Sequence, residues 1–195
     1  MLSIGLTGGI GAGKSLVAQV LEKMGYAVFY SDQEAKALYN EHPELKTQLS
    51  ALVGEEVYHN GLFQKDVLSK ALYNNVALKT QIEALVHPLV RSRFEHWENQ
   101  QKSQFVFNEA AILFETGAYK QFAATVLVVA PLKVRIERVK NRDGLNQKEI
   151  EQRIAAQWPD EQKMLHTPYV LQNDGQPLLV QVEELMEKLQ KLAAN

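Results

Sequence analysis

The sequence predicts an α/β fold, in which a parallel sheet is covered by helices on both faces. Two observations lead to this prediction. Short apolar segments typical of buried strands alternate with longer segments in which apolar residues recur at helical spacing. A glycine-rich loop also stands between the first apolar segment and the first helical one. Strands separated by helices favour parallel pairing, because the chain must cross a face of the sheet between one strand and the next.

The first thirty residues predict a strand, loop, helix and strand in that order. Leu2 to Leu6 form the short apolar run of a first strand. A helix with one apolar face is expected after the loop, from Val17, Val20, Leu21 and Met24. Gly25 is suited to cap that helix, and the apolar segment 26–30 predicts a second buried strand. Together these elements make a βαβ unit.

Further strands are expected at residues 105–107, 125–129 and 169–171, each flanked by helical or turn signals. Near the end of the chain, apolar residues recur four and three residues apart, which predicts a helix packed on the sheet. These residues are Leu178, Val182, Leu185, Leu189 and Leu192.

The segment between the second and third strands is too long for a simple crossover, and it carries much helical pattern but no convincing strand. We expect a helical insertion over the carboxyl edge of the sheet, where open α/β folds bind ligands. His87-Pro88 predicts the end of one helical segment and the start of the next. The expected single domain, residues 1–195, has a core at 1–33, 100–131 and 166–195, the insertion at about 34–99 and a helical segment at about 132–165.

Composition and charge exclude several classes of function. The chain has 195 residues, of which 46% are hydrophobic, as is usual for one globular domain with a sizeable core. A net charge of −2 and an isoelectric point near 6.2 argue against a sequence-independent nucleic-acid binder. The absence of cysteine excludes disulfides, thiol nucleophiles and cysteine zinc sites. No segment reaches the roughly eighteen apolar residues of a membrane span, so we expect a cytoplasmic protein.

Residues 8–15, here called the phosphate loop, spell G-x-x-x-x-G-K-S. Glycines let the backbone turn until several N–H groups face the nucleotide phosphates, and the following helix presents its positive end to the same anion. Lys14 is expected to bridge the β and γ phosphates, and the Ser15 hydroxyl to bind Mg²⁺. The predicted nucleotide contacts are Gly9, Gly11, Ala12, Gly13, Lys14, Ser15 and Leu16.

Asp32 follows the second predicted strand, so its carboxylate should emerge at the same sheet edge as the phosphate loop. It is a candidate to face the acceptor of a phosphoryl group. A local interpretation is equally open, because Ser31 and Glu34 match a capping box and place Asp32 in a first helical turn. The two roles are compatible.

Arg135, Arg138 and Arg142 recur at helical spacing and predict one cationic helix face. Guanidinium groups fork onto phosphate oxygens, so this face is a candidate clamp for the transferring group. The alternative is a solvated helix face, which the presence of a nucleotide site disfavours. Arg153 and Gln157 are candidates to extend the clamp.

Two further segments carry polar groups at predicted strand ends. Glu109 or Glu115 is a candidate to reach Mg²⁺ through water, although solvation is the commoner fate of a glutamate. Asn173-Asp174-Gly175 predicts a tight turn, which can also wrap a purine base with its backbone groups. The guanine-reading sequence Asn-Lys-x-Asp does not occur in the chain.

The segment Leu6–Ser15, LTGGIGAGKS, closely resembles the opening of dephospho-CoA kinases, which usually reads LTGGIGSGKS. The resemblance continues along nearly the whole chain. Its later markers are Asp32 in the family's D-A-D segment, His87-Pro88, the stretch 112–115, Arg138 with Arg142 in an arginine-bearing lid, and Asn173 with Gly175 in the turn beside adenine. Tyr30 departs from the pattern, since it replaces the first aspartate of D-A-D, and Ala111 replaces a common proline.

The resemblance implies transfer of the γ-phosphoryl group of ATP, with Mg²⁺, to the 3′-hydroxyl of dephospho-CoA. It assigns Asp32 as general base, the insertion as acceptor domain and residues 132–165 as lid. Lys14, Arg138 and Arg142 then stabilise the transferred group. We expect no nucleic-acid or membrane partner and a monomer or weak homo-oligomer. The alternatives are another small-molecule kinase, acting on a nucleoside monophosphate or shikimate, and an ATP-dependent switch protein.

Overall fold

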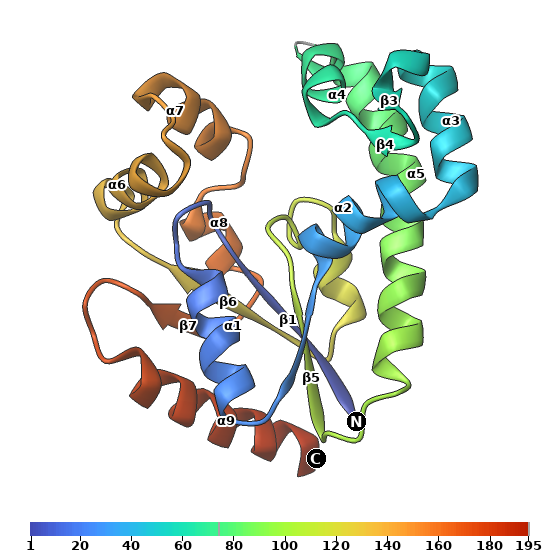
Figure 1. Cartoon of the computed structure of the whole chain (residues 1–195). Helices are drawn as coiled ribbons and strands as arrows, with labels where there is room; N and C mark the ends of the chain where they lie inside the picture. The colour runs from blue at the N-terminus through green and yellow to red at the C-terminus, as the bar shows by residue number, and fades with distance from the viewer. Residues whose placement is uncertain (74, 195) are drawn as a thin grey trace. The chain divides into compact units, whose positions relative to one another are not determined.

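The computed structural model describes residues 1–73 and 75–194. The chain divides into two compact units (Figure 1). The first unit consists of Met1–Tyr30 and Gln100–Asn195, and the second of Ser31–Asn99.

The first unit is built on a parallel sheet, as the sequence predicts. In the described residues this sheet has five strands in the order β2-β5-β1-β6-β7, and every neighbouring pair is parallel. The strands are β1 (Leu2–Gly8), β2 (Ala27–Tyr30), β5 (Phe105–Glu109), β6 (Ala124–Val129) and β7 (Tyr169–Gln172). All five predicted strands are therefore confirmed. The chain begins in the middle of the sheet, so the loop after β1 lies at the carboxyl edge between β5 and β6.

Helices cover both faces of this sheet. On one face, α1 (Lys14–Lys23) and α9 (Leu178–Ala194) contribute Val17, Leu21, Val182 and Leu189 to a core that includes alternate residues of β6. The other face of β6 packs with Phe114 in a smaller cluster. This alternation follows from the period of two along a strand, and it produces the predicted α/β layers.

The remaining helices of the first unit come between β5 and β7 in the sequence. They are η2 (Ala118–Gln121), α6 (Leu132–Asp143), α7 (Gln147–Ala155) and α8 (Asp160–Met164). Helix α7 begins with a full capping box, in which the side chains of Asn146 and Glu149 each bond the other's backbone N–H. Two backbone N–H groups at the start of this nine-residue helix, which have no carbonyl partner within the helix, are thereby hydrogen-bonded.

The second unit is mostly helical and also contains a small hairpin. Its elements are α2 (Ser31–Glu41), α3 (Pro43–Val53), η1 (Glu55–Val57), β3 (Tyr58–His59), β4 (Leu62–Phe63), α4 (Lys65–Leu72) and α5 (Val76–Glu98). The hairpin turns through Asn60 and Gly61, both at positive φ. Two-residue strands are too short to show a period of two in the sequence, so the pattern did not predict them.

The predicted helix junction at His87-Pro88 is wrong, because α5 runs through Pro88 without ending. Proline removes a helical hydrogen bond and crowds the preceding turn, at a cost of about 3 kcal/mol. Apolar side chains on both sides of Pro88 pack into one core, including Ile82, Val86 and Val90. Their burial offsets the cost, and tertiary packing overrides the local signal.

No helix in the part of the chain that the structure describes combines the length and apolar character needed to cross a membrane.

Candidate active site

The phosphate loop forms a tight turn between the end of β1 and the start of α1 (Figure 1). The Ala12 N–H donates to the Gly9 carbonyl at 3.0 Å. Gly13, directly before α1, has a φ of +100°, which side-chain-bearing residues rarely adopt. Ser15 and Leu16 are exposed in the first turn of α1. The loop thus presents the positive end of a ten-residue helix at the carboxyl edge of the sheet.

Arg135 of α6 is buried against the loop. Its Nε donates to the Ile10 carbonyl at 2.9 Å, and its Nη1 pairs with Asp160 at 3.2 Å. The guanidinium occupies the space where a side chain on Gly9 would begin. Burial raises the pKa of Asp160 above its ordinary value, against the lowering effect of Arg135 and Lys163. Arg135 therefore supports the loop from behind.

Arg138 and Asn173 together hold the second half of the loop. Arg138 donates to the carbonyls of Gly11 and Ala12 at 3.4 Å each, and to the backbone and side-chain oxygens of Asn173 at 3.2 and 3.3 Å. The buried Asn173 amide donates to the Ala12 carbonyl at 2.8 Å. A Cβ on Gly13 would lie 2.0 Å from this amide nitrogen. Gly175 follows in the turn after β7, at a φ of +108°.

Arg142 is placed differently from Arg138. Its side chain is 63% exposed, and its guanidinium makes a bidentate pair with Asp143 at 2.7 and 2.9 Å. This hydrogen bond raises the pKa of Arg142 above its ordinary value. Arg153 of α7 stands 4.0 Å from the same carboxylate. The structure thus brings Arg138 onto the loop and leaves Arg142 in solvent beside Asp143.

A buried carboxylate lies beside Lys14. The Lys14 amine donates to the Gly8 carbonyl at 3.2 Å and stands 3.9 Å from Glu109 Oε1. Glu109 ends β5, and its side chain is 7% exposed. Mg²⁺ in kinases is usually bound by one or two protein groups and by nucleotide phosphates, so a buried carboxylate beside Lys14 of the phosphate loop fits such an ion. No cluster of three or more acidic, histidine or cysteine ligands occurs among the described residues.

Glu115, the other acidic candidate, is engaged away from the loop. Its Oε1 accepts the Trp158 N–H at 3.0 Å and pairs with Lys163 at 2.9 Å. The Lys163 side chain is fully buried. A single lysine in a short polar segment gives no sequence signal for burial, which is why Lys163 and Asp160 were missed.

Gln157 bonds two peptide groups, one in the loop and one after β5. Its Oε1 accepts the Ile10 N–H at 2.8 Å, and its Nε2 donates to the Ala111 carbonyl at 3.0 Å. This residue, a candidate for extending an arginine clamp, thus bonds the protein backbone.

Tyr30 ends β2 next to Glu109 of β5. Burial raises the pKa of Tyr30 to about 12, and the hydrogen bond to Glu22 and the charges of Glu22 and Glu109 add to the shift. The phenol therefore keeps its proton throughout the neutral range.

Asp32 belongs to the second unit, where it is exposed in the first turn of α2. Glu34, the expected capping partner of Ser31, pairs with Arg93 of α5 at 2.9 Å. Arg93 also bonds Glu41, so this ion-pair network joins both ends of α2 to α5.

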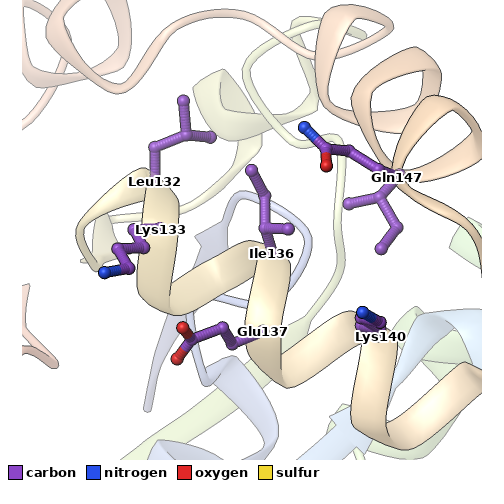
Figure 2. A pocket seen from close by; sticks show the side chains of 7 residues that line it. Leu132, Lys133, Ile136, Glu137, Lys140 and Gln147 are labelled. Atoms are coloured by element: carbon purple, nitrogen blue, oxygen red, sulfur yellow. The ribbon is translucent and has the colours of Figure 1, made fainter.

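A pocket of about 560 Å³ lies between α6 and α7, as Figure 2 shows. Its lining residues are Leu132, Lys133, Ile136, Glu137, Lys140, Gln147 and Ile150. Successive helical residues are rotated by about 100°, so the α6 residues of this pocket lie on the opposite face from Arg135 and Arg138. The pocket is therefore separate from the phosphate loop.

The family model of dephospho-CoA kinases matches residues 2–178. A dephospho-CoA kinase of Bacteroides fragilis is 38% identical over 187 residues, which cover 95% of this chain and 91% of that protein. The chain belongs to the dephospho-CoA kinase family. Members of this family are phosphotransferases, and this chain is one by membership.

Solved structures of similar proteins share the fold. A crystal structure from Thermus thermophilus has a TM-score of 0.85 at 33% identity and covers 98% of this chain and 97% of that one. A dephospho-CoA kinase from Campylobacter jejuni has a TM-score of 0.71 at 20% identity, covering 97% of each chain.

Proposed function

We propose that this protein transfers the γ-phosphoryl group of ATP to the 3′-hydroxyl of the ribose of dephospho-CoA, giving CoA and ADP. The observation that carries the proposal is the phosphate loop, which is complete in sequence and held in a tight turn at the start of α1, in a chain of this family. The loop and helix end would bind the phosphates of ATP through backbone N–H groups.

Lys14 and Arg138 would stabilise the charge on the transferring group. The Lys14 amine already lies within the loop, between the Gly8 carbonyl and Glu109. Arg138 lies on the loop's outer carbonyls. Arg142, one helical turn further along α6, would reach the phosphates after leaving Asp143, an exchange that a 63% exposed side chain makes at little cost.

Ser15 and Glu109 are the residues that would hold Mg²⁺. The ion, when bound with ATP, would neutralise developing charge on the phosphate oxygens. The Glu109 carboxylate is buried at a strand end beside the loop, which favours binding of a cation there.

Asp32 would orient the acceptor hydroxyl and finally take its proton. Phosphoryl transfer passes through a loose transition state, so proton transfer comes late and positioning dominates. An ordinary carboxylate is then a sufficient base. Tyr30 cannot supply this role near neutral pH, because burial raises the pKa of its phenol to about 12.

The insertion at about 34–99 would bind the acceptor, and residues 132–165 would close as a lid over both substrates. Closure would exclude water and suppress hydrolysis of ATP. The proposed contacts of Asn173 and Gly175 with adenine rest on the turn after β7. Because the Asn173 side chain already bonds Ala12, backbone groups of this turn would face the base. A cytoplasmic location and a monomeric or weakly associating state remain predictions.

The test is the release of ADP from Mg-ATP with dephospho-CoA, AMP, shikimate or no acceptor, with Lys14→Met as the inactive control. Release that depends on dephospho-CoA and yields CoA supports the proposal. Dependence on AMP or shikimate instead would assign another small-molecule kinase. Release without any acceptor would assign a switch protein.

A further inference from the structure

We infer that Gln157 is a positioning residue of the phosphate loop, which holds the loop against the end of β5 and sets its affinity for polyphosphates. The inference rests on the proposed binding of ATP at this loop. It assigns to Gln157 a role through the backbone, in place of direct contact with phosphate.

The contacts of Gln157 are unusual because one carboxamide uses both of its functions on peptide groups from distant segments. Oε1 accepts the Ile10 N–H at 2.8 Å, across 147 residues of sequence. Nε2 donates to the Ala111 carbonyl at 3.0 Å, across 46 residues. Both bonds are short and partly buried, so each is expected to persist in solution.

These two peptide groups belong to the two sides of the phosphate site. Ile10 is inside the loop, four residues before Lys14, and Ala111 comes two residues after Glu109. The carboxamide therefore fixes the distance between the segment that carries Lys14 and the segment that carries the buried carboxylate. Lys14 and Glu109 stand 3.9 Å apart in this arrangement.

The peptide group that follows Ile10 is held as well. Its carbonyl accepts from Arg135 Nε at 2.9 Å, and Arg135 is itself paired with Asp160 at 3.2 Å. Gln157 follows the end of α7, and Asp160 is the first residue of α8. One short segment thus clamps the N–H of Ile10 directly and its carbonyl through Arg135.

A clamp on Ile10 affects phosphate binding in a specific way. Gln157 holds the peptide that precedes Ile10 and Arg135 holds the peptide that follows it, so the following N–H groups keep one orientation before nucleotide arrives. Preorganised donors bind an anion without the entropic cost of ordering the loop. The benefit applies to ligands whose β-phosphate reaches the loop, and it is absent for a nucleoside monophosphate bound through its base and sugar.

The experiment compares Gln157→Met with the wild-type protein. Methionine has nearly the same length and shape as glutamine but lacks both hydrogen-bonding functions. We expect the Kd for ADP, measured by calorimetry, and the KM for ATP to rise about 10-fold, since one buried hydrogen bond is worth about a factor of ten. The Kd for AMP and the KM for the acceptor should stay within about 2-fold of wild type.

Gln152→Met is the matched control, because Gln152 lies on α7 and is exposed. It should leave all four constants unchanged. A loss of thermal stability in Gln157→Met does not bear on the inference, which depends on the ratio of ADP to AMP affinity. Unchanged ADP binding, or equal losses for ADP and AMP, would overturn it. Wild-type protein that binds ADP but forms no CoA would count against the proposed function and leave this inference to stand on the binding data.

Discussion

The guanidinium of Arg135 lies where a side chain on Gly9 would begin. A Cβ on Gly9 would stand 2.1 Å from Arg135 Nη2 and 2.4 Å from its Cζ, far inside van der Waals contact. A side chain at position 9 would therefore have to displace the guanidinium that is packed against the loop. A residue in α6, more than a hundred positions later in the chain, explains why the loop carries two adjacent glycines.

This relationship predicts a non-additive pair of substitutions. Gly9→Ala should weaken ADP binding at least about 10-fold, because the methyl group displaces Arg135 from Ile10. In an Arg135→Ala background the same change should add less than about 2-fold, since the clash is gone. Calorimetric ADP binding by the four proteins of this cycle measures the coupling. Equal effects of Gly9→Ala in both backgrounds would contradict the explanation.

Asp32→Asn should lower the turnover number by about 100-fold or more while leaving the affinity for ATP unchanged. The amide keeps the size of the side chain and loses its capacity to accept a proton. Steady-state kinetics with dephospho-CoA and calorimetry with ATP give the two quantities. Asp66→Asn is a fair control, because Asp66 is likewise exposed in the first turn of a helix, α4. Normal turnover of the Asp32 variant would remove this residue from the mechanism.

Arg142→Ala should separate catalysis from stability. The side chain is 63% exposed, so its loss should change the free energy of unfolding by less than about 0.5 kcal/mol. If Arg142 contacts the transferring group, turnover should fall by about 10- to 100-fold. Urea unfolding and steady-state kinetics report the two effects. Lys140→Ala, on the opposite face of the same helix, should change neither, and a similar loss of turnover there would contradict a specific role for Arg142.

Lys163→Met should be strongly destabilising, by about 3–5 kcal/mol, because it leaves the Glu115 carboxylate without its partner in a buried site. Adding Glu115→Gln should recover most of the loss. Glutamine keeps an acceptor for the Trp158 N–H without the charge. Urea unfolding of both variants measures the difference. A double variant as unstable as the single one would mean that packing of the lysine stem, and not charge, dominates.

Tyr30 should make the protein less stable in strong alkali. Its pKa is raised from 10.0 to about 12 by folding, so the folded state holds the proton more tightly than the unfolded chain. The resulting contribution is complete below about pH 10 and is lost as the pH rises toward about 12. Tyr30→Phe should remove this part of the decline, measured as the difference in unfolding free energy from wild type. The same substitution at Tyr73, which is 75% exposed, controls for the loss of one phenol.

The fold was largely predictable because its central strands are buried on both faces and its loop motif is local. β1, β5 and β6 are rich in apolar residues and mostly buried, and the residue types of the segment 8–15 predict the turn between β1 and α1. The failure at Pro88 has a physical cause. Local sequence patterns reflect only the backbone cost of proline. The stabilisation that offsets this cost comes from the packing of Ile82, Val86 and Val90 on other helices.

The candidate site was predictable in membership and less so in geometry. A period along α6 groups Arg135, Arg138 and Arg142 on one face, but it carries no information on which of them meets a carbonyl, a carboxylate or solvent. The same holds for Gln157, whose partners are backbone groups. Every residue carries the same backbone groups, so sequence patterns cannot reveal which of them a side chain bonds.

The hydrogen bonds that join the loop to Arg135, Arg138, Gln157 and Asn173 mean that its eight residues are not a transferable module. Grafted onto another strand and helix, the same letters would lack the side chains that hold three of their carbonyls and one of their amides. A natural variant at any of these four distant positions would alter the nucleotide site. The motif itself would be unchanged in such a variant, so the motif alone would not reveal the alteration.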